Sequence, residues 1–242
     1  MTKLSVNINK IATLRNARGK NNPDVLKTAL DIIAFGANGI TVHPRPDGRH
    51  IRKEDVYTLA NRINVEFNIE GYPNKDFLVM VKEVKAAQCT LVPDPPHVIT
   101  SNAGWNVEKN FSLLQETVAE LHDHGIRTSL FIDPFTLTDK EILLLKQIMT
   151  DRVELYTERY AEDFGTDKAA TTLATYKNVA TTLHKLGIDI NAGHDLDLKN
   201  LRPLIQAIPI IKEVSIGHAL ICDALYFGLE KTIHRYLECL QG

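Results

Sequence analysis

Short β-type runs alternate with longer amphipathic runs along almost the whole chain, and this alternation restricts the fold more than any other feature. The short runs predict strands over Leu4–Ile8, Gly39–His43, Val65–Ile69, Gln88–Val92, Arg127–Ile132, Val153–Tyr156, Asp189–Ala192 and Val214–Ile216. The longer runs predict helices over Asp24–Phe35, Lys53–Arg62, Lys75–Lys85, Val107–His124, Asp139–Met149, Lys168–Leu186, Leu198–Ala207 and Ala219–Leu240. Strands that alternate with helices form a parallel sheet that helices cover.

The segment Asp24–Phe35 illustrates the helical pattern. Its apolar residues fall on one helix face, and Gly36 follows as a C-cap. An eightfold alternation favours closure into an α/β fold of the (β/α)8 TIM-barrel type over an open doubly wound sheet. No linker or low-complexity tract divides residues 1–242, so we predict a single domain.

Charge and composition narrow the classes of function. The 242 residues are 44% hydrophobic, and 28 Lys and Arg face 30 Asp and Glu, so the formal net charge is -2. This balance predicts no nucleic-acid partner, and no apolar stretch predicts a signal peptide or a membrane span. Cys89, Cys222 and Cys239 follow no pattern, which predicts reduced, buried thiols in a cytoplasmic protein.

Polar and cationic residues follow the first predicted strand. Asn7, Asn9 and Lys10 lie at its end, and Arg15 and Arg18 come soon after. Amide and cationic donors of this kind suit an anionic, oxygen-rich ligand, most simply a phosphate ester. Because polar residues recur at other strand ends, we predict one site built by several loops at the carboxyl end of the barrel.

Four of the nine histidines lie at or just after predicted strand ends. They are His43, His50, His194 and His218. Histidine has the side-chain pKa nearest to neutrality, so this placement predicts acid/base chemistry. The convergence of four such residues on one end of a barrel favours a functional over a structural role.

Two carboxylates lie in or directly after predicted strands. Glu70 directly follows the third strand, where burial would raise its pKa and favour its use as a base. Glu154 lies inside the sixth strand, where an inward orientation would place it in the mouth of the barrel. The alternative for Glu154 is an ion pair with Arg152 or Arg159.

The last two strands end in Gly193-His194-Asp195 and Gly217-His218. Phosphate sites in barrels commonly use the loops after strands seven and eight, where glycine lets backbone N–H groups approach the anion. Ala219 opens a helix whose N-terminal dipole favours the same ligand. There is no GxGxxG, P-loop or HExxH motif, so the sequence gives no support for a dinucleotide, nucleoside triphosphate or zincin site.

A cationic cluster follows the second strand and consists of Arg45, Arg49, His50 and Arg52. Taken alone, it is compatible with a solvated loop. Together with Lys10 and Arg18, it supplies positive charge for a second phosphate. Two anion sites around acid/base groups suggest an enzyme that joins two phosphorylated small molecules.

Two segments depart from the regular pattern. Pro93–Asn106 is too long for an ordinary βα turn, and we predict that it forms a lid. Ala219–Leu240 is longer than one layer of a barrel requires. Its apolar residues would cover the barrel or pair with a second subunit, and they include Leu225, Phe227, Leu229, Ile233 and Leu237.

Several motifs recur in order along the chain: Val6-Asn7-Ile8 leading into Ala12–Gly19, Gly39-Ile40-Thr41-Val42-His43 with Arg45 and Arg49-His50-Ile51, Ser129–Asp133, Asn191-Ala192-Gly193-His194 and Ile216-Gly217-His218-Ala219. Together they resemble the pyridoxine 5′-phosphate synthase family of vitamin B6 biosynthesis over essentially the whole chain. The resemblance implies a (β/α)8 barrel with extra helices that assembles as a homo-octamer. It also implies condensation of 3-amino-2-oxopropyl phosphate with 1-deoxy-D-xylulose 5-phosphate, with release of phosphate and water and without a metal or an organic cofactor.

The same resemblance implies roles for individual residues. His43 and Glu70 would accept protons, His194 would donate one, and Glu154 would stabilise charge during the reaction. The aminoketone phosphate would contact Asn7, Arg18, the backbone of Asp195, Gly217 and His218. The deoxyxylulose phosphate would contact Asn9, Lys10, Arg45, His50 and Thr100.

Three positions depart from the family pattern. Many members have Asp-His where this chain has Asn9-Lys10, glycine commonly follows the catalytic histidine where this chain has Asp195, and Gly71-Tyr72-Pro73 is unusual. Two alternatives stay open. One is a metal-dependent barrel hydrolase or lyase that uses the four strand-end histidines and a carboxylate. The other is a phosphosugar-binding relative that has lost turnover through Asn9, Lys10 and Asp195.

Overall fold

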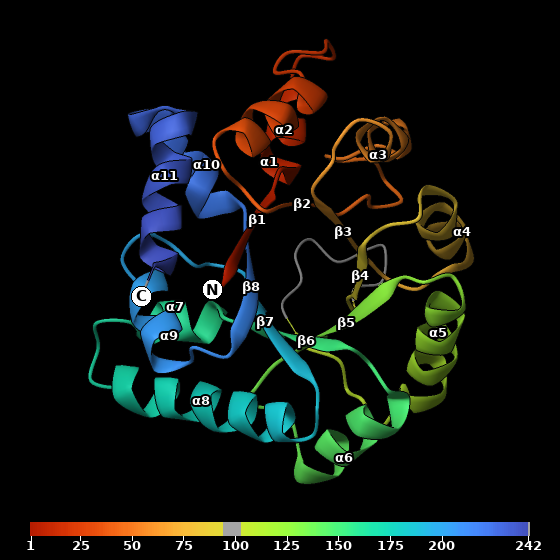
Figure 1. Cartoon of the computed structure of the whole chain (residues 1–242), viewed down its shortest axis with the longest axis vertical. Coiled ribbons are helices and arrows are strands. Elements are labelled where there is room, and N and C mark those ends of the chain that lie inside the picture. The colour runs from red at the N-terminus through yellow and green to blue at the C-terminus, as the bar shows by residue number, and fades with distance from the viewer. Residues whose placement is uncertain (94–102, 242) are drawn as a thin grey trace.

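The computed structural model describes residues 1–93 and 103–241. Within these residues eight parallel strands close a barrel in chain order, which confirms the predicted (β/α)8 fold (Figure 1). The strands are β1 (Lys3–Asn7), β2 (Gly39–Val42), β3 (Glu66–Gly71), β4 (Gln88–Leu91), β5 (Arg127–Ile132), β6 (Arg152–Tyr156), β7 (Asp189–Gly193) and β8 (Ile211–Ile216). All eight were predicted, and the largest difference is at β8, which begins at Ile211 rather than Val214.

Helices surround the barrel, and the described residues contain more of them than the sequence predicts. They are α1 (Asn9–Asn16), α2 (Val25–Ala34), α3 (Lys53–Ala60), α4 (Lys75–Val84), α5 (Phe111–Asp123), α6 (Asp139–Ile148), α7 (Glu158–Asp163), α8 (Ala169–Lys185), α9 (Leu201–Ala207), α10 (His218–Phe227) and α11 (Leu229–Leu240). The short helices α1 and α7 were not predicted. They are only 8 and 6 residues long, which is too short to show a clear helical period.

The predicted single helix over Ala219–Leu240 is wrong, because α10 and α11 are separate helices. Gly228 divides them with a φ of 76°, a conformation that glycine adopts without steric cost. Ile233 in α11 is fully buried against the barrel, whereas Leu225 and Tyr226 at the end of α10 are 76% and 85% exposed. One half of the segment thus covers the barrel, and the corner between the helices leaves apolar side chains in solvent.

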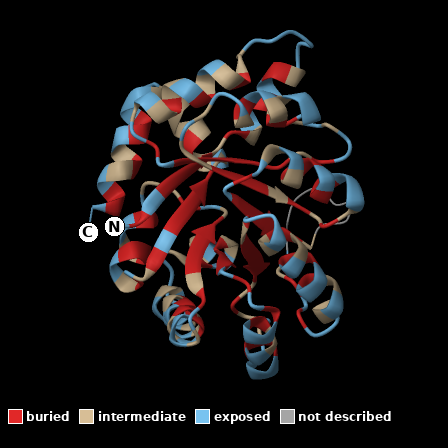
Figure 2. Cartoon of the chain, turned by 45° about the vertical axis from the view of Figure 1, so that its right-hand side comes forward, coloured by how far each residue is buried: buried red, intermediate tan, exposed pale blue. Residues whose placement is uncertain are grey.

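Buried residues fill the strands and the inner faces of the helices (Figure 2). Successive strand residues point to opposite faces of the sheet. In β1, Leu4 and Val6 belong to the apolar core that packs with the helices, while Ser5 and Asn7 alternate with them. The outer face of the strands is therefore apolar and packs against the helices, whereas the inner face can carry polar residues.

The inner face of this barrel is polar. Gln88 Nε2 of β4 donates to Glu213 Oε1 of β8 at 3.4 Å, and since β4 and β8 are not neighbouring strands, this bond crosses the barrel interior. Ser5 and Thr41 share a hydrogen bond of 2.7 Å between β1 and β2. Barrel interiors are more often filled by Val, Ile and Leu. Here the interior is a hydrogen-bonded layer beneath the strand ends.

The segment Pro93–Asn106 is described only at its ends. The indole of Trp105 donates to the carbonyl of Leu91 at 2.8 Å, which fastens the second end of the segment to β4. The predicted lid lies largely in residues 94–102, outside the described residues. The helix predicted to start at Val107 begins at Phe111.

Two further expectations concern the thiols and membranes. Cys89 and Cys239 are buried as predicted, but Cys222 is partly exposed on α10. Along the two described ranges, no helix combines the length and the apolar character needed to cross a bilayer.

Candidate active site

Contacts across the mouth of the barrel join the ends of β1, β3 and β8. Asn7 Nδ2 donates to Glu70 Oε2 at 3.3 Å, and Ser215 Oγ makes a long hydrogen bond of 3.5 Å to Glu70 Oε1. Glu70 is thus brought to the strand ends, as its position after an apolar run predicted. Ser215 was missed, although its place two residues before Gly217 on the inner face of β8 is a signal for it.

Glu154 in β6 is the most deeply buried carboxyl group of the site. The residue is 3% exposed, and its Oε2 has no hydrogen-bond partner within the described residues. Burial raises the pKa of Glu154 well above its ordinary value, and the nearby charges of Glu70 and Glu213 raise it further, while a hydrogen bond with the Thr90 hydroxyl opposes them. This environment favours the protonated carboxyl group.

The alternative ion pairs of Glu154 are not formed. Arg152 Nη1 lies 3.7 Å from a carboxylate oxygen of Glu213, lower in the barrel. Arg159 Nε lies 4.0 Å from Asp163 on α7. Both arginines are therefore near other carboxylates, and Glu154 faces the site, as the inward orientation predicted.

The imidazoles of His43, which is buried, and His50, which is half-buried, form a pair after β2. Their ring centroids are 6.1 Å apart, and the backbone N–H of His43 donates to Asn9 Oδ1 at 3.0 Å. Burial, then the charges of His50 and Arg45, lowers the pKa of His43 to about 3. Burial, then the charges of Arg45 and Lys10, lowers the pKa of His50 to about 4. Both rings are consequently neutral at physiological pH.

His194 follows β7, and its pKa is shifted in the opposite direction from those of His43 and His50. Its Nδ1 lies 2.7 Å from Asp195 Oδ2, and its ring meets the edge of Tyr156 at a centroid distance of 5.0 Å and an angle of 83°. Burial lowers the pKa of His194, but the hydrogen bond and the charge of Asp195 outweigh it, so the pKa is raised. The Asp195 carboxylate and Tyr156 are features that sequence reasoning missed.

The predicted anion site after β8 has little room for side chains. A Cβ at Gly217 would lie 3.0 Å from both the Cβ and the carbonyl oxygen of Asn7, so the backbone of β1 and β8 approach closely there. His218 begins α10, and its Nε2 lies 3.7 Å from Cys222 Sγ. A backbone turn at the start of a helix, beside an imidazole, offers donors to an anion.

The cationic residues after β1 differ in their surroundings. Lys10 is close enough to His50 for its charge to act on that ring, whereas Arg18 is exposed beyond α1 and bonds to no described side chain. Arg15 is not available to a ligand. Its guanidinium group is buried and donates to both carboxylate oxygens of Asp55, with one distance of 2.8 Å, and to the carbonyl of His50 at 3.2 Å.

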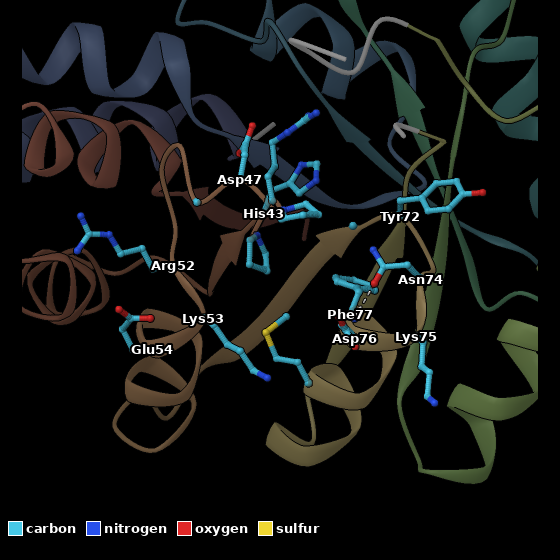
Figure 3. Close-up of a pocket in the computed structure, with 16 residues that line it drawn as sticks. His43, Asp47, Arg52, Lys53, Glu54, Tyr72, Asn74, Lys75, Asp76 and Phe77 are labelled. Atoms are coloured by element: carbon cyan, nitrogen blue, oxygen red, sulfur yellow. Dashed lines mark hydrogen bonds between the residues drawn. The ribbon is translucent and has the colours of Figure 1, made fainter. Parts of the chain in front are cut away.

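A cavity of about 790 Å³ opens beside His43 between the β2–α3 and β3–α4 segments. Figure 3 shows His43 on one side of it and Tyr72 and Asn74 on the other. Arg45 also lines this cavity, so a cationic group and a neutral imidazole face the same space. Volumes of this size are typical of small-molecule sites.

Two further predictions concern Thr100 as a phosphate contact and the binding of a metal ion. Thr100 lies outside the described residues. Elsewhere in the chain the described side chains contain no cluster of three or more His, Cys, Asp or Glu residues arranged to bind a metal ion.

A closed parallel barrel with histidines and carboxyl groups at the carboxyl ends of its strands defines the class of (β/α)8-barrel enzymes. Residues 4–242 match the model of the family described as pyridoxal phosphate biosynthesis protein PdxJ, and the chain belongs to this family. It is 55% identical to pyridoxine 5′-phosphate synthase of Porphyromonas gingivalis, covering 99% of both chains. It is equally similar to the enzyme of that name from Bacteroides fragilis, over 100% of both chains.

Solved structures of other enzymes share the fold. Phosphoribosylanthranilate isomerase from Thermotoga maritima matches with a TM-score of 0.62 at 12% identity over 100% of both chains. The tryptophan synthase alpha-subunit from Pyrococcus furiosus matches with a TM-score of 0.63 at 14% identity, covering 99% of this chain and 96% of that one. At such identities the likeness concerns the barrel alone.

Proposed function

We propose that this chain synthesises pyridoxine 5′-phosphate from 3-amino-2-oxopropyl phosphate and 1-deoxy-D-xylulose 5-phosphate, with release of phosphate and water. Relatives about 54–55% identical over their full length are named pyridoxine 5′-phosphate synthase. The reaction needs an amine to attack a ketone, water to leave, a proton to be taken from carbon, phosphate to be expelled and a ring to close. Each of these steps moves a proton.

The observation that best supports the proposal is the opposite shift in pKa of two histidines that follow barrel strands at the same end. His43 has a pKa lowered to about 3, whereas the pKa of His194 is raised. An imidazole that is neutral and one that holds its proton suit a base and an acid that work at the same pH.

The proposed roles follow from these affinities. His43 and Glu70 accept protons, and His194 donates the proton that lets water leave the carbinolamine. Burial favours the protonated form of Glu154 before the iminium group forms. When water has left the carbinolamine, Glu154 passes its proton to that water, and its carboxylate stabilises the positive charge of the iminium group. Two held substrates also gain from proximity.

Two anion sites beside these groups are part of the proposal. We assign the aminoketone phosphate to Asn7, Arg18, the backbone of Asp195, Gly217 and His218. We assign the deoxyxylulose phosphate to Asn9, Lys10, Arg45, His50 and Thr100. Support comes from the tight approach of Gly217 to Asn7 and from the cavity beside His43 and Arg45.

The proposal includes a cytoplasmic homo-oligomer, an octamer by resemblance to the family. The exposed Leu225 and Tyr226 support an assembled state, because large apolar side chains gathered at one corner commonly mark an interface. Light scattering of the purified protein measures the subunit number directly, and a monomeric mass would contradict this part of the proposal.

An assay of metal-stripped protein with both substrates tests the reaction. We expect pyridoxine 5′-phosphate and inorganic phosphate to appear in equal amounts. Saturable binding without product would instead indicate a binding protein, and activity that returns only with added metal would indicate the hydrolase or lyase class.

Single substitutions test the assigned roles. His194→Ala should retain the fold, judged by circular dichroism, and lose most of the turnover, because general acid catalysis typically contributes about 100-fold or more. Arg18→Ala should weaken binding of the aminoketone phosphate more than that of the deoxyxylulose phosphate. Equal weakening of both would contradict the assignment of Arg18.

A further inference from the structure

His194 and Asp195 are consecutive residues with positive φ angles, 79° and 53°. Residues other than glycine seldom adopt this conformation, and two in succession must be held there by their surroundings. The conformation brings the neighbouring side chains together, with Nδ1 of His194 2.7 Å from Oδ2 of Asp195. At a candidate active site, a strained turn that joins an imidazole to a carboxylate indicates a role for that contact.

We propose that Asp195 is a positioning residue whose carboxylate accepts the Nδ1–H bond of His194, fixes the orientation and tautomer of the ring, and leaves Nε2–H as the proton donor. The inference rests on the proposed function only for the reaction in which that proton is used. It gives the side chain of Asp195 a role separate from the backbone contact already assigned to this residue.

The surrounding bonds show how the turn is held. The single hydroxyl proton of Thr157 is shared between the carbonyl of Gly193, 2.7 Å from Oγ1, and the carbonyl of His194. Asn200 Nδ2 donates to the carbonyl of Asp195 at 3.1 Å. Three successive carbonyl groups are therefore bonded to side chains from other segments, which compensates for the unfavourable backbone conformation.

The ring of His194 is also restrained from the barrel side. The edge-to-face contact with Tyr156 limits rotation, and the Tyr156 hydroxyl donates to Glu158 on α7. Packing on one side and a hydrogen bond on the other restrict the imidazole, whose side chain is 32% exposed. Such restraint is what a proton donor requires for repeated transfer at one face of a substrate.

The charges that face the pair act in the same direction. Burial disfavours the imidazolium, whereas Asp195 favours it most strongly, followed by Glu158 and Glu70. The hydrogen bond from His194 lowers the pKa of Asp195, and the charge of His218 on α10 adds to this effect. A protonated His194 beside an ionised Asp195 is neutral as a pair, so the carboxylate does not present a net negative charge to an incoming phosphate.

Histidine NMR of the full chain without substrates tests the inference. In Asp195→Asn the amide oxygen still accepts the Nδ1–H bond but the negative charge is gone, and in Asp195→Gly both are lost. We expect the titration midpoint of His194, assigned with His194→Gln, to fall in both variants. We expect the Nδ1–H tautomer to be retained in Asp195→Asn and lost in Asp195→Gly.

Asp197→Asn is the matched control, because it removes the same charge two residues along. Asp197 accepts from the backbone of Lys199 and Asn200 instead of from His194. The titration and tautomer of His194 should be unchanged in this variant. If Asp195→Asn and Asp195→Gly left both properties as in the wild type, or if Asp197→Asn moved them equally, the proposal would be overturned.

The pH dependence of turnover adds a functional readout. An acid works while it is protonated, so a lower pKa moves the alkaline limb of kcat to lower pH. We expect this shift in Asp195→Asn and Asp195→Gly, with kcat falling several-fold more than in the wild type toward about pH 9. An altered NMR titration in a protein that makes no product would refute the proposed function and keep the positioning role. Full activity with an unaltered titration would do the reverse.

Discussion

Gly193 leaves the space that the carboxyl group of Glu154 occupies. A Cβ on residue 193 would lie 2.2 Å from Oε1 of Glu154, far inside contact distance. The two residues belong to the adjacent strands β7 and β6, and both are buried. The carboxyl group of Glu154 can occupy its position because Gly193, on the adjacent strand, has no side chain.

Gly193→Ala should therefore displace Glu154. We expect the free energy of unfolding to fall by about 1–3 kcal/mol, as in other overpacked cores, and kcat to fall with it. Chemical denaturation and initial rates measure the two effects. Adding Glu154→Asp, which shortens the acid, should restore part of the stability but not the rate. A double variant no more stable than Gly193→Ala would show that the clash lies elsewhere.

The protonation of Glu154 predicts a pH-dependent stability. Because burial and then the charges of Glu70 and Glu213 raise its pKa, the folded chain keeps a proton that the unfolded chain releases above about pH 4.3. The unfolded state then binds fewer protons, so stability falls as pH rises through the folded-state pKa. The Glu154→Gln variant has no such titration. Its unfolding free energy should therefore rise relative to that of the wild type between about pH 5 and pH 8. A pH-independent difference between the two proteins would argue against a protonated Glu154.

His43 and His50 should remain neutral where His194 titrates. Burial lowers their pKa values to about 3 and about 4. In NMR spectra of labelled protein, assigned with His43→Gln and His50→Gln, their ring shifts should be constant between about pH 5 and pH 8. A titration of His43 near pH 6.5 would mean that its ring is solvated and would remove the basis for its neutral state.

Breaking the nearly buried ion pair of Arg15 with Asp55 should be strongly destabilising. The two side chains are 6% and 12% exposed, so Arg15→Ala leaves a nearly buried charge and should cost about 3–5 kcal/mol of unfolding free energy. Since Arg15 also bonds the carbonyl of His50, KM for the deoxyxylulose phosphate should rise.

The exposed pair of Lys27 and Asp31 is the control for this prediction. Its side chains are 73% and 39% exposed, and Lys27→Ala should cost less than about 0.5 kcal/mol. Urea denaturation of both variants measures the two losses of unfolding free energy. Similar losses in Arg15→Ala and Lys27→Ala would contradict a structural role for Arg15.

The sequence by itself determined the barrel and the location of its site. Hydrophobic period is a local property, so all eight strands were visible, and parallel strands place the residues that follow them at one end. His43, Glu70 and His194 were placed at that end of the barrel in this way. The residue-level match of its motifs to one family also identified the reaction class that full-length relatives support.

The tertiary structure decided which neighbours those residues have. Arg15 and Asp55 are 40 residues apart, and no local pattern shows that this arginine is committed to a carboxylate and not to a ligand. The space for Glu154, the division of the last helices at Gly228 and the turn of Asp195 toward His194 were likewise not predicted. Each depends on contacts between distant segments or on one backbone angle, and these are fixed only when the whole barrel closes.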